Sequence, residues 1–103
     1  RSLGEAQRFF EAGIPLIASI NGVLPGFLFG KTNGHLLVIR GLTATGDVVA
    51  NDPAVLSNAE VRKVYARADF ERVWLGGSGG VVYVIRPARV PLPANVPGLP
   101  ANW

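Results

Sequence analysis

The first twenty residues have a hydrophobic pattern that predicts a short helix followed by a strand. Apolar side chains recur there at helical spacing, at Leu3, Ala6, Phe9 and Phe10. Ser2 and Glu5 have the spacing of a capping box, and Gly13 suits the end of a helix. The β-branched run 14–20 has its proline near the first residue, where strands tolerate it. We therefore expect a helix over residues 2–13 and a strand over residues 14–20.

Two apolar runs in the middle of the chain predict a β-hairpin. Residues 35–40 and 47–51 flank a short segment, 42–46, that is rich in turn-forming residues. The apolar residues run continuously and do not alternate with polar ones, which predicts a hairpin at the centre of a sheet with both faces covered. Residues 21–34, which include Pro25 and four glycines, support only a loop or a broken hairpin.

The last third of the chain predicts a short helix, a strand and a tail. Residues 58–66 are ambiguous between strand and helix. Asp69 is a candidate N-cap of a helix over residues 69–75, whose apolar side chains Phe70, Val73 and Trp74 fall on one face. Residues 81–85 are the clearest strand, and the proline-rich end, 88–103, is expected to wrap the domain or to be disordered. This order of elements favours an α+β domain with a mostly antiparallel sheet.

The composition is that of a globular domain, with 49% hydrophobic and 17% charged residues. The chain opens at Arg1 and contains no methionine, so we expect it to be a piece of a longer protein. No apolar run approaches the ~20 residues needed to span a membrane. The net charge of +3 comes from scattered cations, which favours a solvated surface over a nucleic-acid-binding patch.

Cysteine and histidine counts limit the chemistry. With no cysteine, the chain can form no disulfide and holds no thiol nucleophile of its own. The single histidine, His35, argues against a conventional zinc site, and we expect neither a metal nor a cofactor.

His35 and Asp52 are the candidate catalytic pair. His35 starts the first strand of the predicted hairpin and Asp52 lies just past the end of the second, so the pairing of the strands can bring them together. If the turn is centred between Thr43 and Ala44, the two residues are directly opposite, with Cβ atoms ~5 Å apart. A turn at residues 45–46 would instead bring Asp52 opposite Ile39. A carboxylate on one imidazole nitrogen would leave the other nitrogen to take a proton from a nucleophile. The alternative is an ordinary strand-edge histidine and an Asp-Pro turn.

The run 76–80 contains Ser78 in a G-x-S-x-G pattern, which raises a serine hydrolase as a further alternative. A nucleophile elbow needs a strand before the serine and a helix after it, whereas the reverse order is predicted here. A helix-to-strand connection is therefore the favoured interpretation of this run.

A family resemblance rests on the hairpin and on the residues that follow it. The stretch Gly34–Gly41 with Val48–Pro53, and then Tyr65, Phe70, Trp74 and Gly80–Ile85, resembles the C39-like peptidases, a branch of the papain-like superfamily. The resemblance covers roughly residues 3–87. It implies that His35 is the general base and Asp52 its orienting partner. Family members carry a catalytic cysteine, preceded by a glutamine, near the start of the domain, and this chain lacks that pair.

The resemblance implies that residues 1–87 are the C-terminal sheet half of a papain-like cysteine peptidase fold, with short flanking helices, and that 88–103 are a proline-rich tail. The expected function of the parent protein is hydrolysis of peptide or amide bonds, while this chain alone should be inactive. The alternative is a non-catalytic binding or scaffolding domain of the same fold.

Asn33 and Gly34, at the end of the loop expected to border the cleft, are candidate substrate-binding residues. The expected partners are a peptide substrate and the missing N-terminal half, without which the chain should self-associate or be poorly stable. No nucleic acid is expected as a partner. By resemblance alone, we expect a bacterial, secreted protein of the extracellular space or cell envelope.

Overall fold

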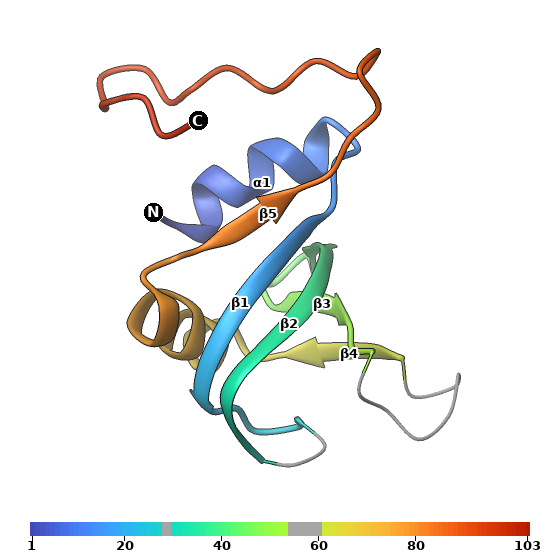
Figure 1. Ribbon diagram of the computed structural model, residues 1–103, viewed down its shortest axis with the longest axis vertical. Coiled ribbons are helices and arrows are strands. Elements are labelled where there is room, and N and C mark those ends of the chain that lie inside the picture. The colour runs from blue at the N-terminus through green and yellow to red at the C-terminus, as the bar shows by residue number, and fades with distance from the viewer. Residues whose placement is uncertain (28–29, 54–60) are drawn as a thin grey trace.

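The strands of the computed structural model form one antiparallel sheet in the order β4-β3-β2-β1-β5 (Figure 1). The structure describes residues 1–27, 30–53 and 61–103. The strands are β1 (Leu16–Val23), β2 (Lys31–Leu42), β3 (Val48–Asn51), β4 (Arg62–Tyr65) and β5 (Val82–Val84). The helices are α1 (Leu3–Glu11), α2 (Arg67–Glu71) and the π-helical η2 (Arg72–Gly76). The predicted α+β class with an antiparallel sheet is confirmed.

Helix α1 begins and ends where its sequence signals predict. The Ser2 side chain accepts a hydrogen bond from the Glu5 backbone N–H at 3.1 Å. At the other end, Gly13 has a φ of 77° and its N–H donates to Phe10, while the N–H of Ile14 donates to Phe9. This pair of bonds is a Schellman motif, which satisfies two carbonyls at the helix end. The reciprocal half of the capping box is absent, because the Glu5 carboxylate binds Arg1 instead.

The helices pack on one face of the sheet, and alternate strand residues form the core with them. The buried cluster joins α1 and η2 to the central strands, through Phe9, Leu16, Leu37, Ala50 and Trp74 among others. On the opposite face, Leu36, Val64 and Tyr83 are about half exposed. We call this opposite side the open face. The prediction that both faces are covered is therefore wrong for the described residues, although β2 does lie at the centre of the sheet.

The first hairpin extends further into residues 21–34 than a simple loop would. Gly22 pairs with Thr32 and Val23 with Lys31, after a register shift that follows Ile20. Strand pairing in this hairpin ends at Val23 and Lys31. Of the two alternatives for this stretch, the broken hairpin is the one observed, because the irregularity at Gly22 interrupts the ladder without ending it.

The second helical segment begins two residues before its predicted start. Asp69 is not the N-cap; its carboxylate accepts a hydrogen bond from Arg72 at 2.9 Å. The cap comes from another part of the chain, since the Asp47 carboxylate accepts from the Arg67 backbone N–H at 3.1 Å. The predicted apolar face is confirmed by the burial of Phe70, Val73 and Trp74.

The ambiguous stretch 58–66 resolves in favour of a strand in its described part. Residues 62–65 form β4, which pairs with β3, whereas positions 58–60 lie outside the described residues. The strand predicted over 81–85 is observed as the shorter β5.

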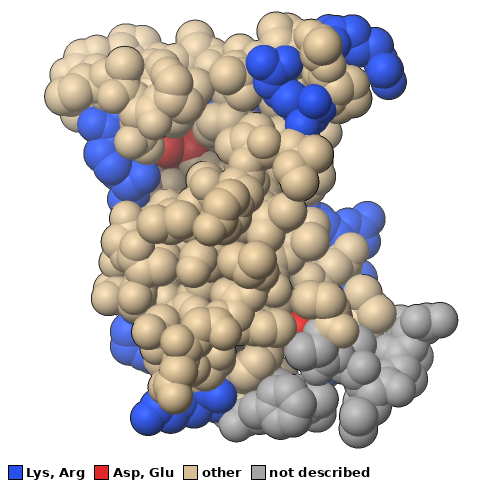
Figure 2. All heavy atoms as spheres, in the orientation of Figure 1, with Lys and Arg blue, Asp and Glu red and all other residues tan. Residues whose placement is uncertain are grey.

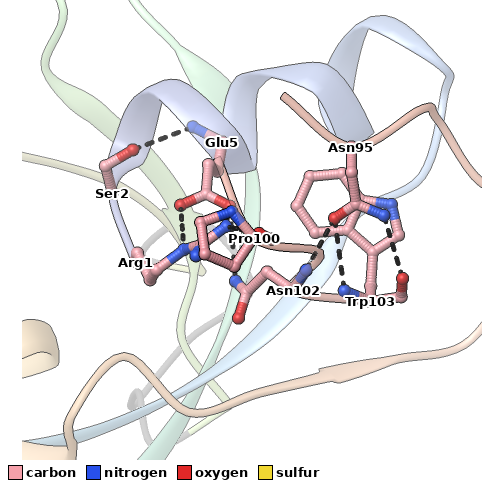
Figure 3. A network of polar contacts seen from close by, with 7 residues as sticks. All are labelled: Arg1, Ser2, Glu5, Asn95, Pro100, Asn102 and Trp103. Atoms are coloured by element: carbon pink, nitrogen blue, oxygen red, sulfur yellow. Dashed lines mark hydrogen bonds and ion pairs between the residues drawn. The ribbon is translucent and has the colours of Figure 1, made fainter. Parts of the chain in front are cut away.

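The proline-rich tail contains no helix or strand and lies along α1, so that the two ends of the chain meet (Figures 1 and 3). The Trp103 and Phe9 rings pack edge to face, with their centroids 4.7 Å apart. The indole N–H of Trp103 donates to the Pro93 carbonyl at 2.7 Å. The Asn95 side chain accepts a hydrogen bond from the Asn102 N–H at 2.7 Å. Hydrogen bonding to Arg1 also lowers the pKa of Glu5, beside this end of the tail. Of the two predicted states of this end, wrapping is the one observed.

Cationic side chains are dispersed over the surface. On the face shown in Figure 2, lysines and arginines lie around the outline and form no single patch. This distribution agrees with the solvated surface that the sequence predicts.

Gly77 is a close-packed position that can be tested by substitution. A methyl group there would overlap the Asn21 carbonyl oxygen and come within 2.9 Å of its nitrogen, whereas Gly76 has nothing within 4 Å. We expect Gly77→Ala to lower the free energy of unfolding by about 1–3 kcal/mol, because backbone atoms cannot yield as a side chain can. Gly76→Ala should be neutral or stabilising by up to about 1 kcal/mol. Urea unfolding of both variants measures the difference, and equal stability would mean that the helix and β1 are less tightly apposed.

Candidate active site

The hairpin of β2 and β3 brings His35 and Asp52 into direct contact. The imidazole Nε2 lies 2.8 Å from the Asp52 carboxylate Oδ1. Val38 is paired with Asn51 and Ile39 with Ala50, so continuing this register sets Asp52 level with Leu37. The prediction of a directly opposite pair is therefore wrong. The offset is two residues, however, and an even offset keeps both side chains on one face, where diagonal neighbours are within reach.

The turn and a bulge together produce this register. Leu42 pairs with Val48, and the N–H of Thr43 donates to the Asp47 carbonyl at 2.8 Å, which closes a loop over residues 43–47, one residue later than the predicted loop 42–46. The register then shifts by one residue between Ile39 and Gly41. The observed alignment consequently falls between the two that the sequence allows.

The two side chains differ in their access to solvent. The Asp52 side chain is 1% exposed and the His35 side chain 19% exposed. The Asp52 backbone N–H donates to the Val61 carbonyl at 2.9 Å, which fixes the residue just beyond the end of β3. The centroid of the Phe27 ring lies 5.1 Å from that of the imidazole, and the two ring planes are inclined by 49°. The imidazole is thus held by a buried carboxylate and an aromatic ring while part of it reaches solvent.

This arrangement has the geometry that proton transfer at His35 needs. With an ionised carboxylate and a neutral imidazole, Nε2 would carry the proton and Nδ1 the lone pair, because an ionised carboxylate can only accept hydrogen bonds. Among the described residues, no hydrogen bond occupies Nδ1. A nucleophile that approaches this nitrogen could transfer its proton there, and Asp52 would stabilise the imidazolium that forms.

The predicted substrate-binding residues Asn33 and Gly34 lie in β2 immediately before His35, and both are exposed. Gly34 has a φ of 149°, which side chains other than glycine's rarely allow, and its N–H donates to the Thr32 hydroxyl at 3.1 Å. Glycine is therefore favoured here by the backbone conformation. The substrate-binding role of the two residues stays a prediction.

Tyr65 is a residue of the site region that the sequence offers only as part of the family pattern. Its side chain is buried, and its hydroxyl has no hydrogen-bond partner among the described residues. Burial, and to a lesser degree the charge of Asp52, raise the pKa of Tyr65 to about 12. A Cβ at Gly26 would lie 3.5 Å from the tyrosine ring, next to Phe27, which packs on His35. Tyr65 therefore belongs to the surroundings of the pair.

Ser78 connects the end of the helical segment to the sheet through its hydroxyl group. Its hydroxyl lies 2.6 Å from the Ser19 carbonyl oxygen and 2.9 Å from that of Trp74, so it ties the end of η2 to β1. No hydrogen bond joins it to His35 within the described part of the chain. The prediction of a helix-to-strand connection is confirmed for residues 79–80, whereas residues 76–78 of the glycine-rich run still belong to the helical segment.

Within residues 1–27, 30–53 and 61–103, no three His, Cys, Asp or Glu side chains gather where they could hold a metal ion. Over the same ranges, no helix has both the length and the apolar character to cross a bilayer.

The raised pKa of Tyr65 predicts a loss of stability at high pH. The folded-state pKa of about 12 exceeds the ordinary value of 10.0, so the folded protein holds this proton more tightly than the unfolded chain does. The free energy of unfolding should be constant for this group below pH 10 and fall by about 2–3 kcal/mol as pH rises to 12. Urea unfolding at pH 9 to 12 tests this. In Tyr65→Phe the free energy of unfolding should fall less steeply with pH, because the phenol that titrates is gone. Tyr83→Phe, at an exposed tyrosine, is the matched control, and identical slopes for the two variants would contradict the assignment.

A model of the Peptidase_C39 like family matches residues 1–81 of this chain. No curated protein and no solved structure matched it. The matched segment contains α1, both strands of the His35–Asp52 hairpin and the helical segment that follows them. Because the match extends over 81 of the 103 residues, the chain belongs to the Peptidase_C39 like family.

Proposed function

We propose that His35 and Asp52 are the general base and the orienting residue of a papain-like cysteine peptidase that hydrolyses peptide or amide bonds. The observation that carries the proposal is the 2.8 Å contact between Nε2 and the buried carboxylate, within the segment that the family model matches. A carboxylate in this position selects the imidazole tautomer that a thiol nucleophile requires.

The nucleophile must come from outside these 103 residues, since they contain no cysteine. We place the thiol against Nδ1 of His35, the nitrogen that Asp52 leaves for it. His35 takes the thiol proton, and the thiolate sulfur attacks the carbonyl carbon of the substrate. The imidazolium then protonates the leaving amine as the carbon–nitrogen bond breaks. Water, deprotonated by the same imidazole, hydrolyses the thioester and restores the thiol.

Asp52 contributes through its burial. An imidazolium that forms beside a carboxylate shielded from water is stabilised more than it would be in bulk solvent. The carboxylate need not take the proton itself. The contact therefore serves both tautomer choice and charge stabilisation in one step.

The partners proposed with this function are a peptide substrate and a cysteine-bearing segment that covers the exposed edge of His35. Asn33 and Gly34 are proposed to line the substrate path because they directly precede the histidine on β2. A location outside the cell or in its envelope is part of the proposal and is supported by the family resemblance alone.

Activity measurements on the longer gene product that supplies the cysteine would test the proposal. With a fluorogenic peptide library as substrate, His35→Ala should reduce kcat/KM by at least about 1000-fold, and Asp52→Asn by about 100- to 10,000-fold through the wrong tautomer. The 103-residue chain alone should be inactive. Circular dichroism should show an unchanged fold in both variants.

Arg89→Gln, at an exposed tail position, is the control and should leave turnover unchanged. Full turnover by the His35 variant would remove His35 from the mechanism. An intact thiol with no turnover on any peptide, together with peptide binding, would instead assign the chain to the non-catalytic binding domains of this fold.

A further inference from the structure

Two neighbouring hollows on the open face share the side chain of Arg40. The first, of about 320 Å³, is walled mainly by apolar residues, which include Phe10, Ile14, Pro15 and Val38. The second, of about 260 Å³, lies between Arg40 and Arg62 over Gly41 and Val49. We call them the apolar hollow and the arginine hollow. Because Arg40 lines both, the two hollows adjoin each other, and we call them together the depression, with an apolar part and a cationic part.

Strand register puts this depression on the face opposite the catalytic pair. Val38 is paired with Asn51, and Asn51 with Arg62, which makes one row across three strands. Ile39 and Ala50, their neighbours along the strands, are buried under the helices. Since side chains alternate along a strand, the row from Val38 to Arg62 belongs to the open face.

The bulge at Arg40 has a role in building this depression. The register of β2 against β3 shifts between Ile39 and Gly41, so Arg40 is the extra residue. A bulged residue leaves the regular ladder and its side chain is re-aimed. Here the outcome is an arginine that borders both hollows.

The charges of the depression are uncompensated within the described residues. Neither Arg40 nor Arg62 makes an ion pair or a hydrogen bond through its guanidinium there, and no Asp or Glu lines either hollow. Arg67 and Arg72, by contrast, pair with Glu71 and Asp69. Guanidinium groups match oxyanions with paired hydrogen bonds, so an anion between the two would satisfy donors that the protein leaves open.

We propose that the depression binds an amphipathic anion, with its carboxylate or phosphate group between Arg40 and Arg62 and its apolar group in the apolar hollow. The apolar hollow, at about 320 Å³, lies at the lower end of the range of about 300–1,000 Å³ that is usual for ligand pockets, and the arginine hollow adjoins it. Apolar walls beside a few convergent polar groups are the usual lining of such pockets. The site is independent of the proposed peptidase chemistry, because it lies on the other face of the sheet.

The binding test uses the full 103-residue chain and octanoate as the probe. Amide shifts in a ¹H–¹⁵N NMR titration should saturate and be largest at Val38, Gly41 and Val49. Arg40→Gln and Arg62→Gln should each weaken binding by about 10-fold, and the double variant should lose it. Arg89→Gln should bind as the parent does, because that exposed arginine lies outside both hollows.

Further probes separate the two halves of the site. Octyl phosphate and octanoate distinguish the two oxyanions, whereas octanol and inorganic phosphate each lack one half of the ligand and should bind at least about 10-fold more weakly. Val38→Thr, which keeps the shape of the side chain, should weaken octanoate but not inorganic phosphate.

Three results would overturn the proposal. The first is an octanoate titration that does not saturate. The second is a double arginine variant that binds octanoate as tightly as the parent chain does. The third is a set of amide shifts spread over all surface cations. Unchanged peptidase activity in the Arg62→Gln variant is expected, because Arg62 lies on β4, outside the hairpin that aligns His35 and Asp52. Failure of this proposal and failure of the peptidase proposal are therefore distinguishable.

Discussion

The contact between His35 and Asp52 depends on the register of β2 against β3, which decides whether the two side chains lie on the same face of the sheet. The turn and the bulge at Arg40 can move the register of β2 and β3, and every odd displacement would send one of the two side chains to the other face of the sheet. The observed displacement is even, so the imidazole and the carboxylate meet at 2.8 Å although they are not level. The bulge is therefore as much a part of the candidate site as the two residues themselves.

Burial gives this contact its chemical character. Asp52 is enclosed on the covered face of the sheet, together with Tyr65, whose pKa is raised to about 12 by burial and by the neighbouring carboxylate. A charge that raises the pKa of a nearby phenol also stabilises a nearby cation, and both effects grow as water is excluded. The imidazole differs because it keeps part of its edge in solvent, which is where a nucleophile could reach it.

The sequence predicts the identity of the pair but not its geometry. Gly34-His35 and Asn51-Asp52-Pro53 are local signals, and so are the Ser2 cap and the Gly13 stop of α1. The register could not be predicted, because it depends on a five-residue loop and a bulge whose signals are weak. The Asp47 cap of α2 and the burial of Tyr65 come from residues far apart in sequence, which local patterns do not connect. The open face was missed because continuous apolar strands do not reveal what covers them.

The two faces of β3 explain how one short strand can serve two sites. Asp52 follows Asn51 directly, yet the alternation of side chains sends the first to the covered face and the second to the open face. The covered face provides low polarity around a fixed carboxylate, which catalysis by an imidazole requires. On the open face Arg40 and Arg62 are exposed to solvent, which suits the capture of an anion. Because Arg40 is the bulged residue, the irregularity that brings His35 and Asp52 to one face also places an arginine beside both hollows of the other face.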